Sequence, residues 1–326
     1  MPSIDLAIII VNWNVADLLR ACLDSIYHAP GAQLEADGTL RLGNYRCTVF
    51  VVDNASTDNS PQMVRELFPQ VQLIASQRNL GFTGGNNIAL RRCNNARYVL
   101  LLNPDTRVVG NALTTMLDYI ESHEAVGVIG PQLRYGDGSL QSSRRRFPTL
   151  MTAFMESTLL QQWFPRNRWA RRYYMADTPD DATQQVDWVN GACMLVRSAA
   201  IQRVGLLDEG FFMYSEELDW CRRMVADGWQ VVYLPQAVVI HYEGQSSGQV
   251  VAARHIRFER SKIRYFRKHH GAWQAALLRL FLLSTYVYRL LEEGAKYLLG
   301  HKRELRRARL AAYAQVIRSG LRPAHV

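Results

Sequence analysis

Short apolar runs alternate with segments of helical periodicity over about the first 130 residues of the chain. The runs typical of buried strands cover residues 6–11, 49–52, 71–75, 98–102 and 125–129. Between the first two runs, Leu19, Cys22 and Ile26 recur at the spacing of one helix face. Strands that alternate with helices predict βαβ units. We therefore expect an α/β fold whose mostly parallel sheet has helices on both faces.

Four consecutive predicted strands end in polar clusters. These clusters are Asn12, Trp13 and Asn14; Asp53 and Asn54; Gln77, Arg78 and Asn79; and Asn103, Pro104 and Asp105. The carboxyl ends of parallel strands meet at one edge of a sheet, where α/β proteins bind ligands. The ring of Trp13 suits stacking on a flat base. Asp53 suits either a hydrogen bond from a ring N–H or an Asx-type cap of the next helix. Together the four ends predict a binding site.

The glycines of the chain exclude two classes of nucleotide site. The Gly-x-Gly-x-x-Gly sequence of dinucleotide-binding proteins is absent after the first strand, where residues 12–17 contain no glycine, and the phosphate-binding loop Gly-x-x-x-x-Gly-Lys-Ser/Thr is absent as well. A glycine-rich stretch lies later, at residues 79–87, and leads into a helix expected over 86–95. Backbone N–H groups at such a helix start can approach a ligand closely.

Three carboxylates, Glu216, Glu217 and Asp219, lie within four positions at the start of a further predicted helix. Acids at a helix start favour the helix dipole, which is their ordinary role. Crowded carboxylates also oppose each other's ionisation, which raises one pKa and suits a general base. The sequence leaves the base open among the three residues.

Charge divides the chain into two predicted parts. From residue 251 onward, 17 Lys or Arg stand against four acids, so the remaining residues carry a formal −4 of the total +9. We expect a catalytic domain over residues 1–250 and a basic amphipathic helical tail over 251–326. Arg279 and Arg289 interrupt the apolar part of the tail, which is therefore not expected to span a membrane. It is expected either to lie on a membrane surface or to pack against the body or a second subunit as a homodimer.

The start of the chain and its cysteines indicate the compartment. The first residues lack the basic region of a signal peptide, and the five cysteines show no paired spacing. We therefore expect no disulfide or zinc framework and a cytoplasmic protein, peripheral at the inner face of the cell membrane. Nucleic acid is not an expected partner.

The motifs "VNWN", "VVDNASTDNS", "RNLGFTGGNN" and "LLNPDT" occur in this order, followed by "RRRFPT", "VDWVNGACMLV", "YSEELDWCRR" and "HYEGQSS". This series resembles the inverting glycosyltransferases of family 2 over roughly residues 5–270, in particular their bacterial rhamnosyltransferase-like branch. The resemblance implies the GT-A fold, a Rossmann-like sheet with helices on both faces, here with a C-terminal helical extension. It also implies a sugar-nucleotide donor and a divalent metal, Mn²⁺ or Mg²⁺.

The resemblance assigns roles to particular residues. Asp105 corresponds to the metal-binding position of the family's Asp-x-Asp motif, in which Asn103 replaces the first Asp, and His241 to a second ligand. Glu217 corresponds to the catalytic base, where the family has Asp. Asn190, Gly191 and Ala192 lie on the acceptor side. The residues implied to bind the nucleotide sugar are Asn12, Trp13, Asn14, Asp53, Asn54, Asn79, Gly81, Asn86, Asn87, Asn103 and Asp105.

The expected function is metal-dependent, inverting transfer of a sugar, with rhamnose as one candidate, in the synthesis of a cell-surface polysaccharide. The donor would be a dTDP- or UDP-sugar, and the acceptor a glycan or a polyprenyl-diphosphate-linked glycan. Asn103 and Glu217 depart from the strictest motifs, which leaves one alternative: a catalytically weak nucleotide-sugar-binding or membrane scaffold protein of the same fold.

Overall fold

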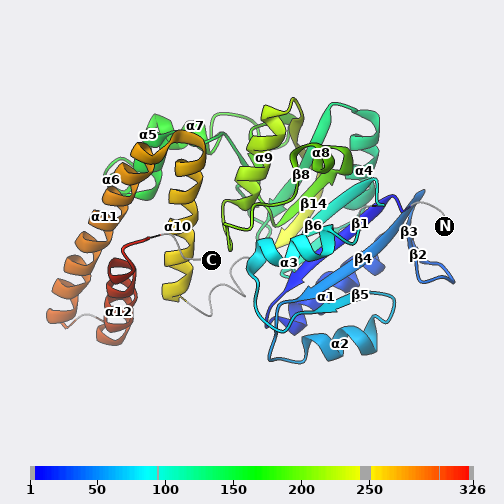
Figure 1. Ribbon diagram of the computed structural model, residues 1–326, viewed down its shortest axis with the longest axis horizontal. Helices are drawn as coiled ribbons and strands as arrows, with labels where there is room; N and C mark the ends of the chain where they lie inside the picture. The colour runs from blue at the N-terminus through cyan, green and yellow to red at the C-terminus, as the bar shows by residue number, and fades with distance from the viewer. Residues whose placement is uncertain (1–3, 94, 243–250, 301, 323–326) are drawn as a thin grey trace. The chain divides into compact units, whose positions relative to one another are not determined.

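The computed structural model describes residues 4–93, 95–242, 251–300 and 302–322 (Figure 1). The chain forms two compact units. The sheet unit comprises Met1–Phe147, Thr178–Phe212 and Glu216–Ser246, and the helical unit comprises Pro148–Asp177, Met213–Ser215 and Ser247–Val326. Residues 148–177 thus belong with the C-terminal helices, although more than 70 residues separate them from residue 251 in sequence.

The centre of the sheet unit is a group of four parallel strands. In spatial order they are β5 (Gln72–Ala75), β4 (Tyr45–Asp53), β1 (Leu6–Asn12) and β6 (Tyr98–Leu102). Seven consecutive residues of β1 are buried, which explains why this strand is a continuous apolar run rather than an alternating one. The register pairs Asn12 with Asp53, so two of the polar strand ends lie side by side.

Further strands, most of them antiparallel to their neighbours, extend this centre into a 12-stranded mixed sheet. Beyond β6 come β13 (Cys193–Arg197), β8 (Val126–Arg134), β14 (Gln230–His241) and β11 (Gln184–Val186). Beyond β4 lies the hairpin of β3 (Leu40–Leu42) and β2 (Ala32–Leu34). The short strands β7 (Thr106–Val109) and β9 (Leu140–Gln141) pair with β14 and β8, and β10 (Arg144–Arg145) forms a separate two-stranded ribbon with β12 (Trp188–Val189).

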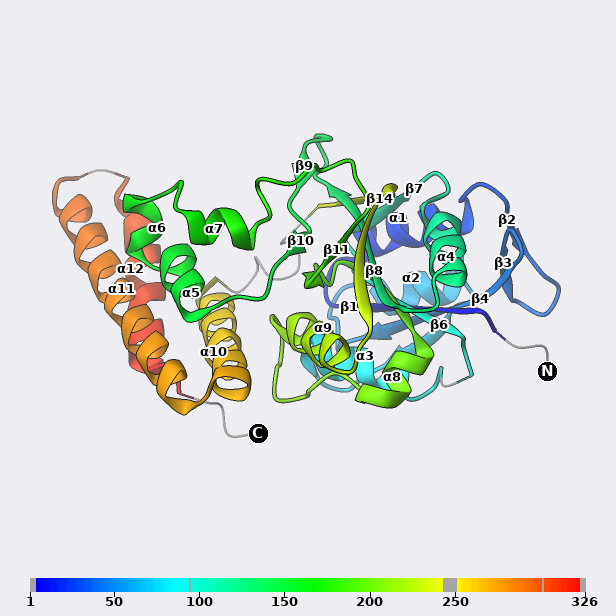
Figure 2. The ribbon, with the colours of Figure 1, turned by 90° about the horizontal axis from the view of Figure 1, so that it is seen from above.

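Helices cover both faces of the sheet (Figure 2). Leu6, Ile8 and Ile10 of β1 share a buried cluster with apolar residues of α1 (Ala16–Tyr27), α2 (Ser60–Leu67) and α4 (Ala112–Ser122). The opposite face carries α3 (Gly81–Leu90), α8 (Ser198–Val204) and α9 (Glu216–Ala226). There α3 approaches β1 closely, because Gly85 leaves no room for a Cβ beside Val11.

All five predicted strands are present, and several boundaries differ from the expectation; β4, for example, begins at Tyr45 rather than at residue 49. The strand predicted over 125–129 continues as β8 through Pro131 to Arg134. Pro131 is tolerated because β14 changes register between Leu234, its partner, and Val238. The first helix starts at Ala16, and the helix expected over 86–95 runs instead from Gly81 to Leu90.

The helical unit contains α5 (Leu150–Ser157), α6 (Leu159–Trp163), α7 (Arg168–Tyr173), α10 (Val251–His270), α11 (Ala272–Leu298) and α12 (Arg303–Ser319). α11 packs against α10, α12 and α5. Its buried residues Leu278, Leu282 and Tyr286 form part of the core of this unit, and Phe281 stacks on Phe154 of α5 with ring centroids 4.5 Å apart. Part of the apolar surface of the tail is therefore buried within the helical unit.

A buried ion pair joins α11 to α12. Arg306 donates to both carboxylate oxygens of Glu293, at 2.8 and 2.7 Å, and Arg309 donates to the same carboxylate at 3.2 Å. Arg306 is thus buried inside the helical unit, although it belongs to the basic tail that was expected at a surface. Within the described part of the chain, no helix is long and apolar enough to cross a membrane.

All five cysteines are free thiols and lie buried in the sheet unit. Burial raises their pKa, to about 12 for Cys22, Cys47 and Cys221 and to about 11 for Cys93. The pKa of Cys193 is shifted in the same direction for the same reason.

Candidate active site

The ends of β1 and β4 form a buried polar pair. The Asn12 amide donates to Asp53 Oδ1 at 3.0 Å, and the backbone N–H of Ser56 donates to Asp53 Oδ2 at 2.9 Å. Both side chains are almost fully buried. The Ser56 contact is an Asx-type turn in the loop, whereas the cap of the next helix that the sequence offered for Asp53 is not formed, because α2 begins at Ser60 after Asn59. Asn12 Oδ1 has no hydrogen-bond partner among the described residues, so one buried acceptor at this strand end is unused.

Asn14 and Trp13 follow β1. Asn14 has a φ of 53°, a left-handed conformation that Asn adopts more readily than most residues. Its backbone N–H donates to Ser56 Oγ at 3.0 Å, and its Oδ1 accepts from the Thr57 N–H at 2.7 Å. The two loops after β1 and β4 are thereby held together, and Trp13 between them is half-buried.

The glycine-rich stretch is held by amide side chains. The Asn54 amide donates to the Gly81 carbonyl at 2.8 Å, and Asn79 Oδ1 accepts from the Gly81 N–H at 2.9 Å. Gly81 has a φ of 74°, and a Cβ here would lie 2.2 Å from the Phe212 carbonyl oxygen. Only glycine fits this position, which explains why α3 begins here.

Asn86 and Asn87 are buried within α3 and bonded internally. Asn86 donates to the Phe82 carbonyl at 2.9 Å. Asn87 donates to the Leu207 carbonyl at 2.9 Å and accepts from the Leu207 N–H at 3.2 Å. Both side chains therefore support the loop, and their contact with a donor stays a prediction.

Strand pairing brings Asp105 and His241 together. β7, which starts one residue after Asp105, pairs antiparallel with β14, so that Thr106 lies opposite His241. His241 Nε2 is 3.4 Å from Asp105 Oδ1 and 3.4 Å from the Asn103 amide nitrogen. Asp105 and His241, which are more than 130 residues apart in sequence, are both buried.

Gln141 orients the His241 ring. Its amide oxygen lies 2.9 Å from His241 Nδ1. Because an amide oxygen only accepts, Nδ1 donates to Gln141, and Nε2 faces Asp105. Sequence analysis missed Gln141, since a lone glutamine on a two-residue strand gives no signal.

Asp105 and His241 fit a divalent metal that the protein only partly coordinates. One carboxylate and one imidazole nitrogen are ligands that Mn²⁺ accepts, and Mg²⁺ sites usually combine one or two carboxylates with phosphate oxygens and water. Within the described residues, no group of three or more His, Cys, Asp or Glu is placed to hold a metal. Donor phosphates would therefore supply further ligands. Of the predicted "HYEGQSS" motif, residues 243–247 lie outside the described residues.

Glu216 and Glu217 at the start of α9 form a buried carboxylate pair. Burial, and then the charge of Glu217, hold the pKa of Glu216 well above its ordinary value. Burial also raises the pKa of Glu217, but the backbone N–H groups of Leu218 and Gly191 and the charge of Arg145 oppose that rise. The environment therefore raises the pKa of Glu216 more than that of Glu217. Glu216 Oε2 and Glu217 Oε2 both lack a hydrogen-bond partner among the described residues.

Asp219 has a different environment from this pair. Its side chain is fully buried, and Arg223 donates to its Oδ2 at 2.9 Å. Arg223 also donates to the carbonyls of Val204 and Leu206, so the ion pair fixes α9 to the end of α8. This arrangement removes the reason for considering Asp219 as the base, because its carboxylate is neutralised by a cation.

The segment of residues 190–192 connects the carboxylate pair with the expected metal site. Gly191 lies beneath Glu217, since a Cβ on Gly191 would be 3.5 Å from Glu217 Cβ. The Ala192 carbonyl accepts from the Asn103 N–H at 2.8 Å, and Asn190 Oδ1 accepts from the Ala192 N–H at 2.8 Å. The segment 190–192 thus contacts Glu217 through Gly191 and Asn103 through the Ala192 carbonyl.

Three further residues near the carboxylate pair, in space or in sequence, were not assigned from the sequence. Arg145 of β10 lies over the Trp188 ring at 5.8 Å and adds positive charge near Glu217; its only signal was the "RRRFPT" motif. Tyr214 and Ser215, directly before Glu216, have φ values of 72° and 63°. Two consecutive left-handed residues without glycine are unusual and strained, and the sequence does not reveal them.

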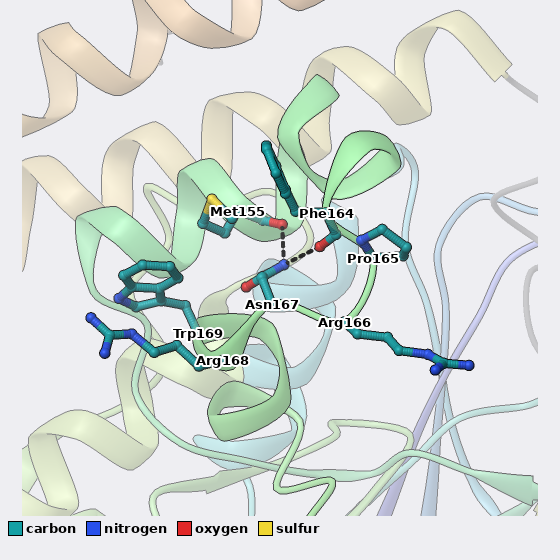
Figure 3. Close-up of a pocket in the computed structure, with 7 residues that line it drawn as sticks. All are labelled: Met155, Phe164, Pro165, Arg166, Asn167, Arg168 and Trp169. Carbon is teal, nitrogen blue, oxygen red and sulfur yellow. Dashed lines mark hydrogen bonds between the residues drawn. The ribbon is translucent and has the colours of Figure 1, made fainter.

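An open hollow of about 450 Å³ lies in the helical unit and includes none of the predicted site residues (Figure 3). Its lining combines apolar and basic side chains: Met155, Phe164, Pro165, Arg166, Asn167, Arg168 and Trp169. The Asn167 amide donates to the carbonyls of Met155 and Phe164, which fixes the turn between α6 and α7. The hollow therefore lies around this turn, and we assign it no role in the site.

The fold of the chain is the GT-A fold. The structure is similar to GalNAc-T7 with UDP, GalNAc and Mn²⁺, with a TM-score of 0.58 and 11% identity over 98% of this chain and 56% of that one. It is also similar to the mannosyltransferase PcManGT from Pyrobaculum calidifontis in complex with GDP-Man and Mn²⁺, with a TM-score of 0.54 and 17% identity over 96% and 84% of the two chains.

The chain belongs to glycosyl transferase family 2, whose family model matches residues 7–204. It is 30% identical to the N-acetylglucosaminyl-diphospho-decaprenol L-rhamnosyltransferase of Mycobacterium tuberculosis over 277 residues, 81% of this chain and 90% of the relative. It is 33% identical to the rhamnosyltransferase WbbL of Escherichia coli over 169 residues, 50% of this chain and 61% of the relative. The expected family, its rhamnosyltransferase-like branch and glycosyltransferase activity are confirmed.

Proposed function

We propose that the protein transfers rhamnose, with inversion, from a dTDP- or UDP-linked donor to an N-acetylglucosamine carried on a polyprenyl diphosphate. The mycobacterial relative, which aligns over 81% of the chain, supports this choice of sugar and acceptor through its name. The observation that carries the mechanism is the Glu217 carboxylate, which lies next to the segment leading to Asn103 and whose Oε2, like that of Glu216, has no hydrogen-bond partner among the described residues.

Asp105 and His241 would hold Mn²⁺ or Mg²⁺, with Gln141 fixing the imidazole tautomer. When bound, such a cation neutralises charge on the leaving diphosphate. Trp13 and Asp53 would position the base of the donor, with Asn12 and Asn14 at the same strand ends. Asn54, Asn79 and Gly81 would shape the loop that contacts the donor, and Asn86 and Asn87 would support it from within α3.

Glu217 would act as the general base. The hydroxyl oxygen of the acceptor attacks the anomeric carbon, its proton moves to Glu217 Oε2, and the bond from the anomeric carbon to the diphosphate oxygen breaks. The nucleoside diphosphate leaves from the face opposite to the attack, which inverts the anomeric centre. Glu216 would stay protonated, so that a second negative charge does not oppose the acceptor oxygen as it develops charge.

The proposal is tested by offering the enzyme dTDP-, UDP- and GDP-sugars with Mn²⁺ and a short-chain prenyl-diphosphate N-acetylglucosamine. We expect dTDP- or UDP-rhamnose to be used, with a product whose anomeric configuration, measured by NMR, is opposite to that of the donor. Transfer of another sugar would correct the donor assignment, and a product of retained configuration would contradict the role of Glu217.

The scaffold alternative is not favoured, because the named relatives of this chain are transferases. We also propose that the protein works at the inner face of the membrane, since a prenyl-linked acceptor resides in the bilayer. As a second proposal, the tail packs against a second subunit in a homodimer.

A further inference from the structure

α11 exposes a row of large apolar residues along its outer side, in addition to the apolar residues that it buries within the helical unit. Its most exposed large residues are Trp273, Leu280, Leu291 and Leu298, at 74%, 60%, 67% and 79%, and Leu299 directly after the helix is 84% exposed. A surface helix of a globular protein normally has polar residues on its outer side. An exposed apolar face of this length, about 40 Å for 27 residues, marks an interaction surface.

The exposed positions of α11, which is described in full, carry no charge. They are Ala272, Trp273, Ala276, Leu280, Phe281, Ser284, Val287, Tyr288, Leu291, Ala295 and Leu298. The charged residues of the helix instead bind within the unit. Glu293 pairs with Arg306, Lys296 pairs with Glu292, and Arg279 donates to the Gly320 carbonyl at 2.7 Å.

Basic residues lie next to one end of this face. Lys302 and Arg303 follow Leu298 and Leu299 closely in sequence, and the Arg303 guanidinium lies over the Tyr297 ring at 5.9 Å. The helical unit as a whole contains 21 Lys or Arg against six Asp or Glu, a formal +15, so the sheet unit carries −6 of the total +9. A large positive charge beside an apolar face is typical of helices that bind anionic lipid surfaces.

We propose that the outer face of α11 docks on the surface of an anionic bilayer, lying parallel to the membrane with its leucines among the lipid headgroups. Charge favours this occupant over a second copy of the chain, because two helical units would each bring +15 to the contact.

Vesicle binding tests the proposal without donor or acceptor, so its result is independent of the proposed reaction. The full-length protein is mixed with vesicles of phosphatidylcholine and phosphatidylglycerol and sedimented. The variant L280Q/L291Q/L298Q should bind at least about tenfold more weakly, because three leucines lose their burial in lipid. Gln has nearly the helix propensity of Leu, so the helix should persist, which circular dichroism checks.

The matched control is L34Q/L67Q, which makes the same change at two exposed leucines of the sheet unit and should bind like the native protein. A second variant, K302Q/R303Q/R307Q, removes exposed bases and leaves the Arg306 pair intact. It should weaken binding about fivefold per residue at low salt, and have no effect on vesicles of phosphatidylcholine alone.

Two outcomes would overturn the proposal. One is vesicle binding that is absent from the native protein or unchanged in L280Q/L291Q/L298Q. The other is a native dimer that this variant dissociates, measured by sedimentation equilibrium, which would assign the α11 face to a second copy of the chain.

Discussion

The two units of this protein depart from the usual distribution of residues in opposite directions. The sheet unit buries polar side chains, among them Asp53, Asp105 and Glu216, whereas the helical unit exposes Trp273 and several leucines. Buried carboxylates and exposed apolar faces both cost free energy unless something else uses them. In the sheet unit we assign that use to chemistry on a sugar nucleotide, and in the helical unit to contact with a lipid surface. Mutations of the buried polar residues and of the exposed apolar residues should therefore have different effects.

The largest effect is expected at the base of the sheet unit. Glu217→Gln keeps the shape of the side chain and removes its ability to accept a proton, so transfer should fall by about 10²-fold to 10⁴-fold. Donor affinity, measured by calorimetry, should change little. The exposed Glu66→Gln serves as the matched control and should leave both quantities unchanged. If Glu216→Gln proves the more damaging change, the assignment of the base within the pair is wrong.

Loss of the expected metal ligand comes next. Asp105→Ala should remove the dependence of donor binding on Mn²⁺ and lower transfer by roughly 10²-fold, because the leaving diphosphate loses its counter-charge. Thermal unfolding without ligand should be little changed, since the contact of Asp105 with His241 is long, at 3.4 Å. Donor binding that keeps its full metal dependence in this variant would contradict the assignment.

In the helical unit, the buried Arg306–Glu293 ion pair is expected to affect stability rather than catalysis. Arg306→Gln leaves the buried Glu293 carboxylate with a weaker partner, Arg309, and should lower the free energy of unfolding by about 2 kcal/mol. Arg307→Gln, one position along and exposed, should change it by less than about 0.5 kcal/mol. Equal effects in urea denaturation would show that the Arg306 pair does not stabilise this unit.

The smallest effect is a gain in stability in the sheet unit. Because the pKa of Glu216 is raised in the folded protein, the folded state binds a proton that the unfolded state releases, and stability falls as pH rises above the ordinary value of about 4.5 towards the raised one. Glu216→Gln removes this loss. Its melting temperature should therefore exceed that of the native protein at about pH 8 and match it more closely at about pH 5. The reverse pH trend would contradict a neutral Glu216.

Three of the four central strands, β1, β4 and β6, were predictable because their apolar runs are buried on both faces. The runs ending at Asn12, Asp53 and Leu102 are apolar without interruption, and such runs bounded by turn residues are typical of buried parallel strands. The boundary of α3 was not predictable, because it depends on the close approach of Gly81 to Phe212, a contact over more than 130 residues. Gly81 alone does not reveal that contact.

The sequence could name candidate residues for the site but not the contacts between them. The strand ends and the resemblance named Asp105, His241 and Glu217, but nothing in the sequence pairs β7 with β14 or brings Gln141 to His241. The sequence also could not distinguish Asp219 from its neighbours, since the difference is an ion pair with Arg223 that depends on the direction of α9 side chains. The contacts between these residues therefore depend on pairing between distant segments, which the local sequence pattern does not reveal.

The buried thiols make the two units separately observable. The five cysteines belong to the sheet unit, and with pKa values raised to about 11 or above they are almost entirely protonated near neutral pH. An alkylating reagent reacts with the thiolate of an accessible cysteine, so the native chain should be protected. Its labelling rate would then follow the opening of the sheet alone, while the cysteine-free helical unit could loosen or dock without being recorded. The natural cysteines thus serve as built-in reporters of local unfolding in the catalytic unit.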